Sequence, residues 1–294
     1  MDAVYHIPAL LDPTIDGLNI RPDGTYVDVT FGGGGHSRAL LARLGANGRL
    51  YSFDRDMDAY ANAPSDSRWH FVHSDFRYLR NFMDYYGVRA VDGILADLGV
   101  SFHHFDSAGR GFSFRFDGPL DMRMNATGGR TAADIVNTAT EEDLARVLYI
   151  YGELKNSRQL ARRIVAARAK EPVTRTSQLA DIVGTDKKVL TLVFQALRIE
   201  VNDELGALRE MLLSAAELLK SGGRIAVLTY HSLEDRIVKN FLRSGNIDGK
   251  TEKDFYGNIL TPFTLIEKGL CASEEEVAAN PRARSAKLRI AEKK

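Results

Sequence analysis

The chain has 294 residues, 44% hydrophobic and 27% charged, which is typical of a soluble globular protein with one or two domains. It contains no apolar run of about 18 residues and no charged-then-apolar leader, so we expect no membrane span, no secretion and a cytoplasmic location. A single cysteine excludes an internal disulfide and a cysteine-rich zinc site, and 39 basic against 39 acidic residues exclude a strongly basic nucleic-acid binder.

The first predicted unit is a strand, four glycines and a helix. Residues 25–31 are rich in Val, Thr and aromatic side chains, as in a strand buried on both faces, and leucines recur at helical spacing through residues 37–44. The glycines at 32–35 let the backbone adopt positive φ and approach a ligand closely, while the helix directs free N–H groups at that ligand. A nucleotide-like ligand is predicted here; the alternative is a tight strand-to-helix turn without a ligand.

Acidic residues follow the next three predicted strands, at 49–53, 69–73 and 91–96. These residues are Asp54, Asp75 and Asp97. The carboxyl ends of parallel strands meet at the ligand-binding edge of an open α/β sheet, so we expect the acids to lie together there. Asp54 also has the position after the glycines at which an acid accepts hydrogen bonds from ribose hydroxyls. The alternative, helix capping, suits Asp56 better.

The pattern changes at residue 109. Residues 109–124 mix glycine, arginine, phenylalanine and methionine without a period, which is typical of a functional loop. Residues 131–203 then show only helical patterns, with Thr-x-x-Asp capping signals at 131 and 140. In this region Arg158 and Arg162 share a helix face, which predicts either a solvated surface or a contact with a phosphate backbone. Further strands are expected at 224–230, 262–267 and 287–291.

The glycine turn favours one cofactor over others. A dinucleotide turn would need a third glycine where Ser37 stands, no Gly-Lys-Ser/Thr of a P-loop follows, and no group of residues shows metal-ligand spacing, so no metal is expected. The class I methyltransferase turn fits better, through Asp28, Gly32 and Gly34, although Thr30 replaces its first glycine. S-adenosylmethionine would suit a ribose-binding acid, an aromatic wall and a carboxylate near its cationic end.

Seven motifs closely resemble those of the RsmH (MraW) family, in collinear order from residue 6 to 292. They are TFGGGGHS at 30–37, DLGVS at 97–101, GFSFR at 111–115, DGPLDMRM at 117–124, FQALRI at 194–199, HSLEDR at 231–236 and NPRARS at 280–285. The resemblance implies a bacterial enzyme that transfers a methyl group from S-adenosylmethionine to the N4 amine of a cytidine in small-subunit (16S) ribosomal RNA. The implied substrate is the free RNA or the assembled small subunit, and a homodimer remains an alternative to the monomer.

The implied fold is α/β: a Rossmann-like class I methyltransferase sheet of about seven strands, the last antiparallel, with an inserted helical domain. We assign residues 1–125 and 205–294 to the methyltransferase domain and residues 126–204 to the inserted substrate-recognition domain.

Site residues are carried over by motif position. The cofactor's methionine end is assigned to Gly32, Gly34, Gly35 and His36, its ribose to Asp54, its adenine to Phe76 and its methyl region to Asp97. His104 stands where the family often has a glutamine and can still make one hydrogen bond. Asp97 and His231 are the predicted catalytic residues. The predicted RNA contacts are Phe112, Phe114, Arg115, Arg123, Arg158 and Arg162.

The expected chemistry starts from a weak nucleophile, because the lone pair of the cytosine amine is delocalised into the ring. Asp97, or a backbone carbonyl beside it, would accept a hydrogen bond from the amine while the unstacked base is held in line. A DNA amino-methyltransferase is the nearest alternative enzyme, but both prolines of its usual motif are missing after Asp97. A non-catalytic assembly factor with a vestigial cofactor pocket is the alternative outside enzymes.

Overall fold

The computed structural model describes residues 8–99 and 108–294. The chain forms two compact units, one made of Met1–Gly99 with Leu205–Lys294 and the other of Val100–Glu204. The predicted second boundary, at 204/205, coincides with this division. The first boundary falls after Gly99 instead of after residue 125, so the loop at 109–124 belongs with the helices.

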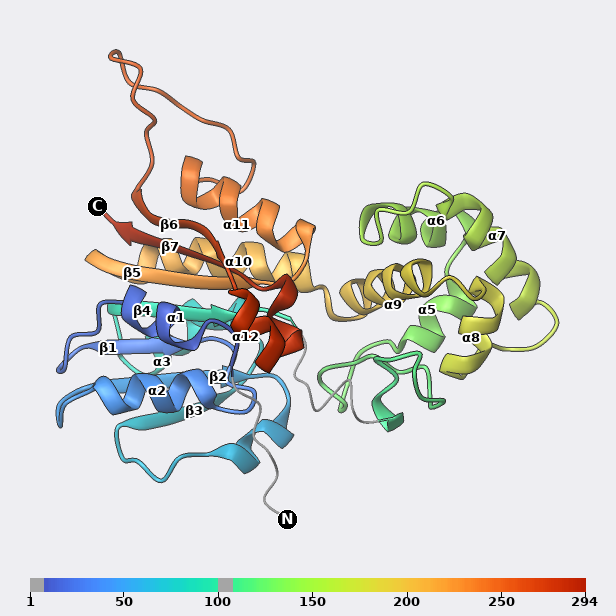
Figure 1. The fold of residues 1–294 in the computed structure, drawn as a ribbon, viewed down its shortest axis with the longest axis horizontal. Helices are drawn as coiled ribbons and strands as arrows, with labels where there is room; N and C mark the ends of the chain where they lie inside the picture. The colour runs from blue at the N-terminus through green and yellow to red at the C-terminus, as the bar shows by residue number, and fades with distance from the viewer. Residues whose placement is uncertain (1–7, 100–107) are drawn as a thin grey trace. The chain divides into compact units, whose positions relative to one another are not determined.

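A seven-stranded sheet in the order β3-β2-β1-β4-β5-β7-β6 forms the centre of the first unit (Figure 1). Its strands are β1 Thr25–Asp28, β2 Arg49–Asp54, β3 Trp69–His73, β4 Val91–Asp97, β5 Leu219–Thr229, β6 Phe263–Cys271 and β7 Lys287–Lys293. The first five pair in parallel, and β7 runs antiparallel to both β5 and β6. The predicted class I methyltransferase sheet is thereby confirmed, including its single antiparallel strand.

Alternate residues of each inner strand enter different hydrophobic clusters, because successive side chains of a strand point to opposite faces. Val27, Tyr51 and Ile94 belong to one cluster, and Tyr26 and Leu50 belong to the other. The helices of this unit are α1 Leu11–Gly17, α2 Gly35–Arg43, α3 Leu79–Tyr85, α10 Glu204–Leu218, α11 Ser232–Ser244 and α12 Glu274–Ala279. Short 3₁₀ helices lie at Met57–Asn62, Phe76–Tyr78 and Pro281–Ser285.

Strand β1 is shorter than the sequence pattern predicts. It ends at Asp28, although residues 29–31 are as apolar as the strand itself. The backbone still follows its neighbours for a short distance, because the N–H of Val29 donates to the carbonyl of Leu95 and that of Phe31 to the carbonyl of Phe53. The chain therefore leaves the sheet between two parallel strands, which brings the glycines to the carboxyl edge.

The second unit is helical, as predicted. Among its described residues the α-helices are α5 Ala132–Thr138, α6 Glu141–Ile150, α7 Ser157–Arg168, α8 Thr176–Val183 and α9 Lys187–Asn202, and their apolar faces share one core. Both predicted caps are confirmed: Thr131 forms a capping box with Asp134, and the Thr140 hydroxyl accepts from the Asp143 N–H. Helix α9 ends at Asn202, and the following Asp203, whose φ is 46°, separates it from α10.

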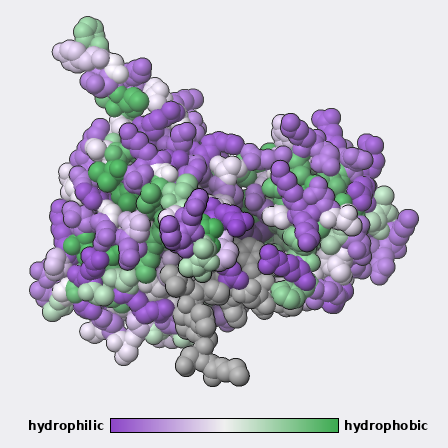
Figure 2. Space-filling view, in the orientation of Figure 1, coloured by the Kyte–Doolittle hydropathy of each residue, from purple (hydrophilic) through white to green (hydrophobic). Residues whose placement is uncertain are grey.

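A segment at residues 245–262 projects from the first unit between α11 and β6 (Figure 1). It carries both hydrophilic and hydrophobic surface (Figure 2), and Phe255 and Tyr256 on it are 98% and 87% exposed. Lys253 pairs with Ile259 in an isolated bridge that orders the tip. None of the helices in the described ranges combines the length and the apolar character that a membrane span requires.

Candidate active site

The glycine turn begins at the end of β1 and adopts a backbone that favours glycine. Gly32 and Gly34 have φ values of 50° and 72°. A Cβ at Gly34 would lie 2.9 Å from the ring of Phe31, whereas one at Gly32 would meet nothing within 4 Å. The two glycines therefore differ: Gly34 is required by local packing and φ, and Gly32 leaves open space beside its backbone.

The buried carboxylate of Asp28 supports this turn through hydrogen bonds. Asp28 is 0% exposed; its Oδ2 accepts from the Ser37 hydroxyl at 2.6 Å and its Oδ1 from the Thr30 N–H at 3.0 Å. Ser37 in turn lies 2.8 Å from the Ser52 hydroxyl. Burial raises the pKa of Asp28, against the opposing effect of the hydrogen bond from Ser37. The network ties β1, β2 and the start of α2 together beneath the turn.

Asp54, the predicted ribose acceptor, ends β2 and also holds the turn. Its Oδ2 accepts from the Gly32 N–H at 2.8 Å, and its Oδ1 accepts from the Asp56 N–H at 2.8 Å. Asp54 therefore holds the glycine turn, and its contact with a ribose stays a prediction. Asp56 caps the following 3₁₀ helix through the Asp58 N–H at 3.1 Å, as the sequence suggested.

Phe76, predicted to contact adenine, lies at the end of β3 in the same unit. It is partly buried against the sheet cluster. The guanidinium of Arg55 stands 5.7 Å from its ring centroid and pairs with Asp75 at 3.0 Å. One face of the ring is therefore used in a cation–π contact.

Asp97 at the end of β4 is the centre of a polar cluster. Its Oδ1 accepts from the Tyr230 hydroxyl at 2.7 Å, its Oδ2 lies 3.5 Å from Nδ1 of His36, and its N–H donates to Thr30 at 2.6 Å. Burial, reinforced by the charge of Asp97, raises the pKa of Tyr230 above its ordinary value. Tyr230 therefore remains a hydrogen-bond donor to Asp97. Asp97 and His36 are site residues that their motifs predict, whereas no sequence pattern predicts Tyr230.

His36 is almost fully buried beneath this cluster, with a side chain 5% exposed. Burial alone lowers its pKa, but the hydrogen bond and charge of Asp97 outweigh that effect and raise the pKa of His36. Its Nε2 makes no well-formed hydrogen bond in the part of the chain that the structure describes, and the backbone of Ala9 also acts to raise the pKa of His36. A buried ring nitrogen beside a glycine turn suits a contact with a polar ligand.

We expect the His36–Asp97 pair to make stability depend on pH. The folded-state pKa of His36 is raised, so its contribution is fully present below about pH 6.5, the unfolded value, and is lost as pH rises through the folded pKa. The difference in melting temperature between the wild type and His36→Gln should therefore shrink from about pH 6 to about pH 9. A difference that stays constant or grows over this range contradicts the assignment.

Pro8 packs directly on the start of α2. A Cβ added at Gly35 would lie 2.3 Å from Cγ of Pro8, and the nearby Leu10 N–H donates to Glu276 on α12 at 2.6 Å. We expect Gly35→Ala to displace Pro8 and to lower the free energy of unfolding by about 1–3 kcal/mol, as other overpacked sites do. Chemical denaturation measures the loss. Gly32→Ala is the matched control, because Gly32 has a positive φ but no atom within 4 Å of the place where a Cβ would stand.

His231, the other predicted catalytic residue, caps helix α11. Its Nδ1 accepts from the Glu234 N–H at 3.4 Å. Its Nε2 lies 3.2 Å from Oε1 of Glu234, in a geometry that makes no hydrogen bond, and its side chain is 10% exposed. The ring thus has a structural use as a helix cap, and its catalytic role stays a prediction.

The predicted RNA-contacting aromatics lie in the helical unit. Phe112 is 3% exposed within the helical core, so its ring is occupied by packing. Phe114 is partly buried and meets Phe194 edge-on, with centroids 5.5 Å apart. A base could use only the outer part of Phe114. Sequence periodicity could not show this, because residues 109–124 have none.

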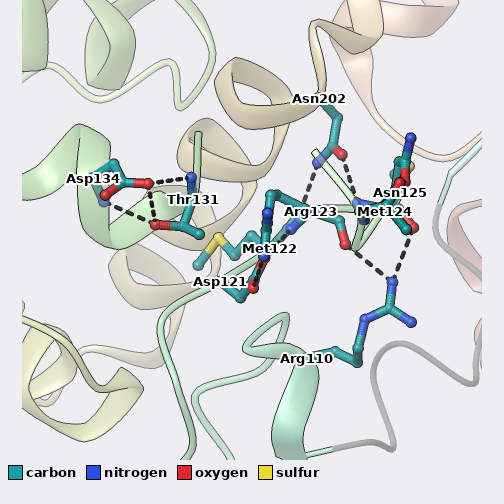
Figure 3. Close-up of polar contacts among 10 residues, drawn as sticks. Arg110, Asp121, Met122, Arg123, Met124, Asn125, Thr131, Asp134 and Asn202 are labelled. Atoms are coloured by element: carbon teal, nitrogen blue, oxygen red, sulfur yellow. Dashed lines mark hydrogen bonds and ion pairs between the residues drawn. The ribbon is translucent and has the colours of Figure 1, made fainter. Parts of the chain in front are cut away.

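The arginines of this unit differ in accessibility. Arg123 is held by both oxygens of Asp121, each at 2.8 Å, and Arg110 donates to the carbonyls of Arg123 and Met124 (Figure 3). Asn202 on α9 holds the same loop, because its Oδ1 accepts from the Met124 N–H and its Nδ2 donates to the Met122 carbonyl (Figure 3). In contrast, the predicted contacts Arg115, Arg158 and Arg162 are exposed. His104 lies outside the described residues.

Comparison with known proteins agrees with this geometry. The model of the MraW methylase family matches residues 3–294. The ribosomal RNA small subunit methyltransferase H of Phocaeicola vulgatus is 59% identical over 298 residues, covering 99% of this chain and 98% of the relative. The proteins of the same name from Parabacteroides distasonis and Flavobacterium johnsoniae are 60% and 52% identical, covering 99% and 98% of this chain and 98% of each relative. With its glycine turn and strand-end acids in that family's sheet, the chain belongs to the MraW methylase family.

Proposed function

We propose that this methylase transfers a methyl group from S-adenosylmethionine to the N4 amine of a cytidine in small-subunit ribosomal RNA. The observation that carries the proposal is the Asp97 carboxylate, held at the end of β4 by Tyr230 beside the glycine turn. The names of relatives at 52–60% identity support the RNA as substrate. We further place the enzyme in the cytoplasm.

The residues present fit S-adenosylmethionine. Gly32 has no neighbour where a Cβ would stand, and the buried Nε2 of His36 makes no well-formed hydrogen bond in the described part of the chain, so both suit the methionine end. Asp54 is the proposed acceptor for the ribose hydroxyls, and Phe76 offers an aromatic wall for adenine. The cofactor would supply an electrophilic methyl on a cationic sulfur, and the Asp97 carboxylate lies beside the same turn.

Asp97 is the proposed acceptor for the amine of the target base. A carboxylate oxygen that accepts an N–H hydrogen bond favours a pyramidal nitrogen, whose lone pair is then available to attack. The cofactor would supply the methyl group, and the Asp97 carboxylate is the proposed acceptor for the proton that the amine nitrogen would lose on methylation. Tyr230 and His36 hold the carboxylate in place from either side. Positioning of this kind supplies most of the expected rate enhancement.

The helical unit is the proposed substrate-recognition domain. Arg115, Arg158 and Arg162 are exposed, so their positive charges are accessible to the phosphates of an RNA. The outer part of Phe114 is the proposed stacking surface. Activity measured on free RNA and on assembled subunits distinguishes the two possible substrates. Size-exclusion chromatography of the enzyme distinguishes a homodimer from a monomer.

Transfer of labelled methyl groups tests the proposed reaction. Assembled small subunits, naked small-subunit RNA and DNA are compared side by side with the same labelled cofactor. We expect label at N4 of a cytidine in one of the two ribosomal substrates and none in DNA. Label in DNA, or no label despite cofactor binding, would overturn the proposed function and favour a DNA methyltransferase or a non-catalytic assembly factor.

A further inference from the structure

A hollow that Tyr230 helps to line opens where β5 passes into α11. Its volume is about 450 Å³, within the range of small-molecule sites. It is lined by Thr229, Tyr230, His231, Ser232, Asp235, Arg236, Lys239, Asn240, Ser285 and Lys287. We propose that this cavity, the α11 pocket, binds a backbone phosphate of the RNA next to the target nucleotide; this inference rests on the proposed function.

Basic residues on one face of α11 define the chemistry of the α11 pocket. Ser232, Arg236 and Lys239 recur at i, i+4 and i+7, so they line up along the helix on the side of the cavity. Lys239 is exposed and pairs with no carboxylate within the described ranges 8–99 and 108–294. A cation held at the mouth of a cavity without an acidic partner suits an anionic ligand.

The one acid in the α11 pocket does not cancel this charge, because it is already paired. Asp235 accepts from Arg289 at 2.7 and 3.1 Å and from Lys287 at 3.3 Å. Burial acts to raise its pKa, but the bonds from Arg289 and Lys287 prevail and keep the pKa of Asp235 below its ordinary value. Asp235 is therefore ionised and neutralised from β7, and the exposed Lys239 adds positive charge to the lining.

Polar groups between these cations complete the lining. Ser232, Asn240 and Ser285 bring hydroxyl and amide groups, which together with lysine and arginine are the usual donors to phosphate oxygens. His231 also lines the α11 pocket, where its Nδ1 accepts from the Glu234 N–H and its Nε2 lies 3.2 Å from Oε1 of Glu234.

The place of the α11 pocket fits a substrate that extends from the reacting centre. Tyr230 belongs to the pocket wall, and its hydroxyl reaches Oδ1 of Asp97 at 2.7 Å. A nucleic acid whose base lies against Asp97 continues through its sugar to a phosphate, and Tyr230 belongs both to the Asp97 cluster and to the lining of the α11 pocket. The geometry favours a polymeric substrate over a free base, which has no phosphate to bind.

Kinetics on Lys239→Gln test the inference. We expect the KM for the ribosomal substrate to rise about tenfold and the salt dependence of RNA binding, log Kobs against log salt, to lose about one unit of slope. The kcat and the affinity for S-adenosylmethionine should stay at wild-type values, and Lys239→Arg should restore the KM because either cation binds phosphate. Arg243→Gln, an exposed position one turn further along α11 and outside the lining, is the matched control.

The outcomes separate this inference from the proposed function. If the wild type methylates no ribosomal substrate, the proposed function fails. If the wild type is active and Lys239→Gln keeps the wild-type KM and salt slope, the α11 pocket is not a phosphate site. An equal effect from Arg243→Gln also overturns the inference, because the result would then reflect general surface charge. Equal melting temperatures of all four proteins establish that the variants are folded.

Discussion

Asp97→Asn is expected to lower kcat for methyl transfer by about 10²- to 10⁴-fold, the range that a positioned proton acceptor contributes. An asparagine keeps the size of the side chain and can still accept from Tyr230, so the fold of the site should persist. It loses the negative charge that receives the amine proton. Binding of S-adenosylmethionine should change by less than about tenfold, or 1.4 kcal/mol.

Single-turnover methyl transfer and calorimetric titration of the cofactor measure these two quantities separately. The matched control is Asp92→Asn, on the same strand but at its other end, where Asp92 binds Lys220 at 2.7 Å and the Thr25 N–H at 2.9 Å. This control should cost about 1–3 kcal/mol of stability while leaving kcat unchanged. Near-normal turnover of Asp97→Asn would exclude the acceptor role.

Asp54→Ala should weaken binding of S-adenosylmethionine by about 10- to 150-fold, corresponding to the 1.5–3 kcal/mol of hydrogen bonds to a charged group. The substitution removes the proposed ribose contact and also the acceptor for the Gly32 N–H. The glycine turn then loses one of the bonds that hold it in the ligand-binding conformation. Asp54→Ala therefore affects both the proposed ribose contact and the glycine turn.

The neighbouring Asp56→Ala is a close control for Asp54→Ala. Asp56 follows the same strand, but its carboxylate caps the 3₁₀ helix at Met57–Asn62. Loss of that cap should cost about 1 kcal/mol of stability and leave the dissociation constant of the cofactor near the wild-type value. Equal weakening by both variants would mean that Asp54 acts only through the general stability of this edge.

Local patterns were enough to predict the sheet and much of the first unit. The strands, the glycine turn and the acids at strand ends depend on neighbours in the sequence, because side-chain alternation and glycine φ are properties of a few residues. The same holds for the Thr131 and Thr140 caps, which span three residues. The collinear motifs then indicated the MraW family, which the comparisons confirm.

Only the tertiary structure decided which side chains meet. Tyr230 is 133 positions from Asp97, and no local pattern predicts that its hydroxyl donates to that carboxylate. Likewise, Phe112 looked like an exposed stacking residue in an aperiodic loop, but it packs into the helical core. Arg123 looked available, but Asp121 holds it. Periodicity predicts which face of an element is buried; it does not determine how a loop without a period is packed.

The α11 pocket illustrates the same division. The HSLEDR motif at 231–236 holds two acids and one arginine, and the sequence does not show which of these charges are paired. In the fold, Asp235 is neutralised by Lys287 and Arg289 from β7, a strand more than 50 residues away. Long-range pairing thus determines the net charge of a site, since it depends on which ions are brought together. The sequence by itself determined the sheet, the turn and the family; the tertiary structure determined the partners of each charge.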